Sequence, residues 1–146
     1  MFDIIPQLHV LGITENEIIV TALELYQPYK VSQQQAHDEL AAMIKKEMKN
    51  ITISSLISAA IHLDATGMTE DPDALNGNKK LYSPAIIGSA IAESIGGSYA
   101  YFEYTRFSRK SPGILKITSP FLREALAGLM AGCTSRLYST ALPVEE

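Results

Sequence analysis

The chain has 146 residues, of which 47% are hydrophobic and 19% are charged, and its formal net charge is −4. This length suits one domain with a real core, so we expect a single helical domain over residues 1–146. No apolar run reaches the roughly 18 residues of a membrane span, and the acidic balance argues against non-specific nucleic-acid binding, which depends on many phosphate contacts.

The first residues, MFDIIPQLHVLG, carry Asp3 and Pro6 but no basic region. This start does not have the pattern of a secretory signal. The single cysteine, Cys133, excludes an internal disulfide and fits a reducing compartment. We therefore expect a cytoplasmic protein with no integral membrane association.

A first helix is predicted after Thr14, because Thr14 and Glu17 have capping-box spacing. Ser32 and Gln35 repeat this signature before a second helix. Pro28, between the two, should end the first helix. Apolar residues at three- and four-residue steps predict the buried faces of both helices: Ile18, Ala22, Leu25 and Tyr26 in the first, and Ala36, Leu40, Met43, Ile44 and Met48 in the second.

A third helix should begin after Asn50 or Thr52 and close at Gly67. The turn-rich residues 68–80 then predict an exposed loop. This loop divides the chain by charge: residues 1–78 hold 4 Lys or Arg against 11 Asp or Glu, while residues 79–136 hold 8 against 3.

We therefore distinguish an acidic half (1–78), a basic half (79–137) and a tail (138–146). Opposite charge lets the halves attract each other within one chain or between copies, and lets the basic half receive a small anion. Ordinary solvated faces are the alternative.

Two helices rich in small residues are predicted in the basic half. Each begins at a Ser-Pro pair, with Ser83 expected to cap the first and Pro84 to fill its first turn. Glycine and alanine recur at four-residue steps in both helices, which favours close packing between them: Gly88, Ala92 and Gly96 in one, Gly128 and Gly132 in the other. We expect a compact all-α bundle of about five or six helices, assembling as a symmetric homo-oligomer.

Residues 98–107 alternate in a way that also suits a strand, but no second strand signal accompanies them. We interpret this segment as helix, followed by a turn at Ser111-Pro112-Gly113. The histidines His9, His37 and His62 are too scattered for a local metal motif. No serine has the surroundings of an activated nucleophile, and Cys133 lies among small apolar residues, as expected of a buried inert thiol.

Basic residues surround the Ser-Pro-Gly turn and suit a phosphate: Arg106, Arg109 and Lys110 before it, Lys116 and Arg123 after it. Arg123 falls in the first turn of the last helix, where a positive charge is unfavourable unless an anion or carboxylate lies nearby. A plain surface pair between Arg123 and Glu124 is the alternative.

In order and spacing these segments resemble the phosphatidylglycerophosphatase A superfamily. The nearest branch is the archaeal alpha-ribazole phosphatase of cobalamin synthesis. The resemblance rests on several segments, read from about Leu8 to Tyr138: the small-residue helix ISSLISAAIHLD, the stretch LYSPAIIG, the turn RKSPGIL and the helix FLREALAGLMAGCTSRL.

The resemblance implies an all-α fold and Mg²⁺-dependent hydrolysis of a phosphomonoester, alpha-ribazole 5′-phosphate or, failing that, phosphatidylglycerophosphate. It implies that Glu124 is the catalytic carboxylate and a metal ligand. Asp64 is a further candidate metal ligand, because it could reach a site at the end of the third helix, and Asp64, Glu93 and Glu103 could replace the missing acids if folding brings them together. The small phosphorylated substrate would be bound by four basic residues: Arg106, Arg109, Lys110 and Arg123.

The chain departs from the family at its acidic positions. An Asp-Glu pair of the family falls at Pro84-Ala85, an Asp-Asp pair at Arg123-Glu124, and a further Asp near Ser108. One carboxylate beside an arginine is a poor Mg²⁺ site, so we expect Mg²⁺ to bind weakly or not at all there. The alternative function is a catalytically inactive relative that binds an anionic ligand or serves in assembly.

Overall fold

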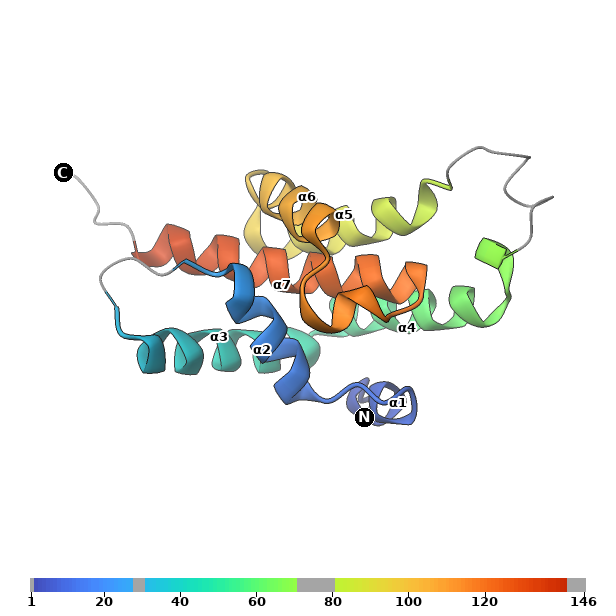
Figure 1. Cartoon of the computed structure of the whole chain (residues 1–146), viewed down its shortest axis with the longest axis horizontal. Helices are drawn as coiled ribbons and strands as arrows, with labels where there is room; N and C mark the ends of the chain where they lie inside the picture. Colours follow the sequence, from blue (N-terminus) through green and yellow to red (C-terminus); the bar gives the residue numbers. More distant parts are fainter. Residues whose placement is uncertain (1, 28–30, 71–80, 142–146) are drawn as a thin grey trace.

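The computed structural model describes residues 2–27, 31–70 and 81–141, and every regular element in these ranges is helical (Figure 1). The expected all-α fold is therefore confirmed, and residues 100–110 are helix, as expected. Seven α-helices and two short 3₁₀ helices lie in the described ranges: α1 (Ile5–Val10), α2 (Glu15–Leu25), α3 (Gln33–Met48), α4 (Ile51–Ala65), η1 (Met68–Glu70), α5 (Ser83–Gly96), α6 (Ala100–Lys110), η2 (Gly113–Lys116) and α7 (Pro120–Ala141).

Helix α1 is one helix more than the sequence indicated. Pro6 occupies its first turn, where a missing N–H is harmless. Asp3 Oδ1 accepts a hydrogen bond from the backbone N–H of Ile5 at 3.0 Å. Leu8 is buried in the core, so this short helix is stabilised by packing rather than by its own length.

The expected N-caps of α2, α3 and α4 are confirmed. Thr14 accepts from the N–H of Glu17 and Ser32 from that of Gln35, each at 3.1 Å. Asn50, rather than Thr52, caps α4. Helix α4 is followed by Gly67, whose φ of +72° lies in the left-handed region.

The expected cap of α5 is wrong. Tyr82 precedes the helix as its N-cap residue, Ser83 is the first helical residue, and the Tyr82 side chain makes no capping hydrogen bond. Pro84 carries no N–H and its fixed φ already suits the first turn, so the helix begins without a side-chain cap.

Two expectations fall on residues outside the described ranges. Pro28 was expected to end the first helix, and α2 indeed ends before it, at Leu25. Of the loop expected over residues 68–80, only the first three residues are described, and they form η1.

Helix α7 forms the centre of the bundle. In Figure 1 it runs between α5 and α6 on one side and α3 and α4 on the other, and its contact with α5 is the most extensive of any pair. Most of α7 is buried, Cys133 fully so. The two small-residue helices are thus packed together centrally, as the glycine spacing predicted. Among the described residues, no helix is long and apolar enough to cross a membrane.

Candidate functional site

A cavity of about 740 Å³ opens where α5, α6 and the start of α7 meet, and we call it the α5–α7 cavity. Its wall combines hydroxyls, two arginines, one carboxylate and an apolar side. The lining residues are Thr69, Leu81, Pro84, Ala85, Tyr101, Tyr104, Thr105, Ser108, Arg109, Ser111, Pro120, Arg123 and Glu124.

The three places where the resemblance predicts acids all lie on this cavity. Pro84 and Ala85 come from α5, Ser108 from α6, and Arg123 with Glu124 from α7. Residues far apart in the sequence are therefore gathered at one place. Among the expected phosphate-binding residues, Arg109 and Arg123 line the cavity as well, while Arg106 and Lys110 do not.

Among the described residues that line the cavity, Glu124 is the one carboxylate, and its side chain is only 9% exposed. Its Oε1 accepts a hydrogen bond from the hydroxyl of Tyr104 at 3.2 Å and another from the hydroxyl of Ser108. Its Oε2 has no hydrogen-bond partner among the described residues. Among the described residues, the nearest cation to that oxygen is Arg123, whose Nε lies 3.7 Å away. This distance is too long for a hydrogen bond.

Tyr104 also lines the site, although no role was predicted for it from the sequence. Burial, followed by the nearby negative charge of Glu124, raises the pKa of its hydroxyl above the ordinary 10.0. Its neutral hydroxyl therefore remains a donor to Glu124. The signal that could have found it is helical spacing, because Tyr101, Tyr104 and Ser108 recur at three- and four-residue steps on one face of α6.

The described residues place two guanidinium groups and one carboxylate on the wall of the cavity. Arg109 is exposed and has no acidic partner within 4 Å in the described part of the chain, and the Arg123 side chain is 37% exposed. Because Arg109 and Arg123 outnumber Glu124, whose carboxylate already accepts two hydrogen bonds, these residues give the wall a net positive charge. Such a wall attracts a small anion.

Arg106 lies away from the cavity and holds two helices together. Its guanidinium donates to the backbone carbonyl of Leu25 at the end of α2 and forms an ion pair with Glu103 on α6. Its donors are thus directed toward α2. Lys110 is exposed at the end of α6.

Asp64 also lies outside the α5–α7 cavity, at the start of α7. Its two carboxylate oxygens accept hydrogen bonds from the N–H groups of Phe121 and Leu122, each at 2.9 Å. Asp64 therefore caps α7 from α4 and supplies the negative charge that the first turn, with Arg123, requires. Because these two N–H groups are occupied, they are not available to a phosphate.

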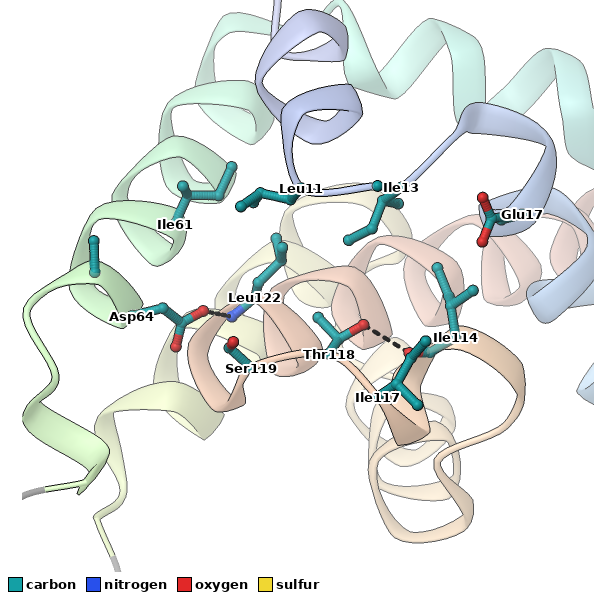
Figure 2. A pocket seen from close by; sticks show the side chains of 12 residues that line it. Leu11, Ile13, Glu17, Ile61, Asp64, Ile114, Ile117, Thr118, Ser119 and Leu122 are labelled. Atoms are coloured by element: carbon teal, nitrogen blue, oxygen red, sulfur yellow. Dashed lines mark hydrogen bonds between the residues drawn. The ribbon is translucent and has the colours of Figure 1, made fainter.

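Figure 2 shows Asp64 at the edge of a second cavity, of about 320 Å³. Its wall is largely aliphatic and includes Leu11, Ile13, Ile61, Ile114, Ile117 and Leu122. Of the described residues, two carboxylates line it, Asp64 and Glu17, and no lysine or arginine does. This second cavity therefore does not suit an anion.

The described residues of the α5–α7 cavity do not offer a ligand set that fits a magnesium ion. No group of three or more His, Cys, Asp or Glu side chains in the described ranges is placed to hold a metal. Mg²⁺ prefers an octahedral set of oxygen ligands, whereas Glu124 offers one unpaired oxygen with Arg123 beside it. The positive charge of Arg123 opposes a cation at that place.

Comparison with known proteins identifies one archaeal relative. The chain is 32% identical over 128 residues to the uncharacterized protein MJ1330 of Methanocaldococcus jannaschii, in an alignment that covers 80% of this chain and 96% of that protein. The chain therefore belongs to the same family as MJ1330. No family model matches the chain, and no solved structure matches it.

Proposed function

We propose that this protein binds the phosphate group of a small phosphorylated molecule in the α5–α7 cavity. One observation supports the proposal: the positions that the resemblance aligns with the acids of the phosphatidylglycerophosphatase A superfamily line this cavity, and in this chain they hold proline, alanine, serine and arginine beside Glu124. The resemblance indicates where a ligand would bind. The substituted residues make this place positively charged, where the acids expected from the resemblance would make it negatively charged.

Arg109 and Arg123 are the phosphate-binding groups in this proposal. A guanidinium donates two parallel hydrogen bonds to a phosphate, and such charge-assisted bonds contribute about 1.5–3 kcal/mol each. The hydroxyls of Thr105 and Ser111 also line the cavity and supply neutral polar contacts. The apolar side, formed by Leu81, Pro84 and Ala85, suits the remainder of the ligand.

The resemblance nominates the first ligands for testing. These are alpha-ribazole 5′-phosphate and, after it, phosphatidylglycerophosphate. The second candidate function is Mg²⁺-dependent hydrolysis of the same phosphomonoester. Glu124 at a family carboxylate position favours it, while the Arg123 guanidinium 3.7 Å from that carboxylate opposes it.

The test is isothermal titration calorimetry of the purified protein with alpha-ribazole 5′-phosphate. Arg109→Gln and Arg123→Gln should each weaken binding by about 10-fold or more, because each removes a charge-assisted contact. Lys116→Gln is the matched control, since it removes an exposed positive charge that does not line the cavity.

A parallel assay measures phosphate release with and without Mg²⁺. Binding without turnover supports the proposal. Turnover that requires Mg²⁺ and disappears in Glu124→Gln supports the second candidate instead. If no phosphorylated compound binds, or if all three charge variants behave alike, the proposal is wrong.

A further inference from the structure

The second cavity, beside Asp64, adjoins a further cavity along α2, of about 340 Å³. The two share Glu17, Ile114 and Ile117, and we call them together the α2–η2 groove. Figure 2 shows the aliphatic side chains of its first part, with Asp64 at one end and Glu17 at the other. We propose that this groove binds a basic amphipathic helix of a partner protein. The apolar face of the helix would lie against the aliphatic floor, and its Lys or Arg side chains would meet Glu17 and Glu24.

The first step of the argument is the exposure of large apolar side chains on the groove. Ile117 is 87% exposed, Leu11 50% and Val20 48%. All three line the groove, and they come from three separate segments: Ile117 directly follows η2, Leu11 directly follows α1, and Val20 lies on α2. Removing such side chains from water is favourable, and exposed apolar residues that gather at one hollow are typical of an interaction site.

The second step is the charge around this apolar floor. Glu17 and Glu24 are about two turns apart on α2 and share one face of that helix. Neither has a cationic side chain within 4 Å in the described part of the chain. Of the described residues that line the groove, none is Lys, Arg or His, and Lys116 at the end of η2 is not among them. The complementary surface is therefore apolar and positively charged.

The third step is the shape of the occupant. No strand in the described ranges offers a sheet edge with which an extended peptide could pair. A helix satisfies its own backbone hydrogen bonds and presents apolar side chains at i, i+3, i+4 and i+7. A nucleic acid or an anionic membrane would bring phosphates toward Glu17 and Glu24, which repel them. A symmetric pairing of two copies through this groove would place the same carboxylates face to face.

The experiment uses a fluorescein-labelled peptide of about 18 residues, made of leucine and lysine, with the leucines on one helical face. One control peptide has the same composition in an order that spreads the leucines around the helix. A second control has glutamate in place of every lysine. Fluorescence anisotropy at low ionic strength should show that the wild-type protein binds the first peptide about 10-fold or more tighter than either control. Added salt should weaken this binding.

Ile117→Ser and Glu24→Lys test the apolar and the charged part of the groove. Both positions are exposed, so neither change should disturb the core. Ile117→Ser should weaken peptide binding by about 10-fold, through loss of an apolar contact. Glu24→Lys should weaken it by about fivefold, because attraction becomes repulsion. The matched controls are Ile86→Ser and Glu93→Lys, which change exposed residues of α5 outside the groove and should retain wild-type binding.

The outcomes decide between this partner and other occupants. If the leucines bind as well when spread around the helix, or if the α5 controls lose as much binding as the groove variants, the inference is wrong. Equal binding of the glutamate peptide also overturns it, because charge then plays no part. If sedimentation shows an oligomer that dissociates in Ile117→Ser, and the peptide does not compete with it, a second copy covers the groove instead. The α5–α7 cavity shares no described lining residue with the groove, so the proposed function is tested separately.

Discussion

Gly88 of α5 and Gly128 of α7 touch backbone to backbone. A Cβ atom added to Gly128 would lie 2.1 Å from the carbonyl oxygen of Gly88, a rigid neighbour that cannot turn aside. Gly128→Ala should therefore destabilise the protein by about 1–3 kcal/mol or more, through overpacking of the central helix pair. Urea unfolding followed by circular dichroism measures the change.

Whether Gly128→Ala lowers or raises the stability distinguishes overpacking from helix propensity. On helix propensity alone, replacing a helical glycine by alanine should stabilise by about 1 kcal/mol. Ser94→Ala, at an exposed position of α5, controls for propensity without overpacking. A Gly128→Ala protein as stable as the wild type would show that the two backbones are not in contact.

Asp64 should contribute to stability as the cap of α7. Asp64→Ala leaves the N–H groups of Phe121 and Leu122 without their acceptors and places Arg123 in an uncompensated first turn. Loss of a cap typically lowers stability by about 0.5–2 kcal/mol. Thermal unfolding measures the loss, and Glu93→Ala, which removes an exposed carboxylate on α5, should change it little. Equal melting temperatures for the two variants would contradict the capping role.

Variants of Arg106 and Arg109 should distinguish a residue that stabilises the fold from one that binds the ligand. Arg106→Gln removes the link from α6 to the Leu25 carbonyl and the pair with Glu103, so stability should fall by about 1–3 kcal/mol. Phosphate-ester binding by the folded variant should stay unchanged, because Arg106 does not line the cavity. Arg109→Gln should show the opposite pattern. Calorimetry and urea unfolding of both variants test this, and weaker binding in Arg106→Gln alone would overturn it.

The buried Tyr104 hydroxyl should make the protein sensitive to alkali. Its pKa is raised in the folded state above 10.0, the value we take for the unfolded chain. Stability from the neutral hydroxyl is thus fully present below pH 10 and is lost as the pH rises above it, because the unfolded chain then releases a proton that the folded chain retains.

Urea unfolding between about pH 9 and pH 11 measures this slope. Tyr104→Phe should reduce it but not abolish it, because burial also raises the pKa values of Tyr26 and Tyr138. Tyr99→Phe, which removes an exposed hydroxyl, should leave the slope of the wild type. An unchanged slope in Tyr104→Phe would show that its hydroxyl is not held neutral by the fold.

Local features were predictable from the sequence, because the atoms involved are a few residues apart. The caps at Thr14 and Ser32 follow from side-chain spacing alone. The close packing of α5 on α7 follows from small residues that recur at four-residue steps along both helices. The prediction failed at Ser83, because a proline in the first turn makes a cap dispensable.

Long-range relationships were not predictable in the same way. The capping of α7 by Asp64 joins residues more than 50 positions apart, and no local pattern encodes it. One exception is the orientation of Arg106. Once residues 100–110 are taken as a helix, Arg106 falls on a different face from Tyr104 and Ser108, so the sequence could have predicted that it points away from them. The gathering of Pro84, Ser108 and Glu124 on one cavity required the fold.

The burial of Cys133 provides a natural reporter. This thiol is the only one in the chain, it is fully enclosed by the central helix packing, and burial raises its pKa. A thiol reagent can therefore modify it only when α7 separates from its neighbours. The rate of modification would measure how often the bundle opens, with no probe introduced. A slower rate in the presence of a phosphate ester would report that the ester occupies the α5–α7 cavity, although the reagent reacts elsewhere, at Cys133.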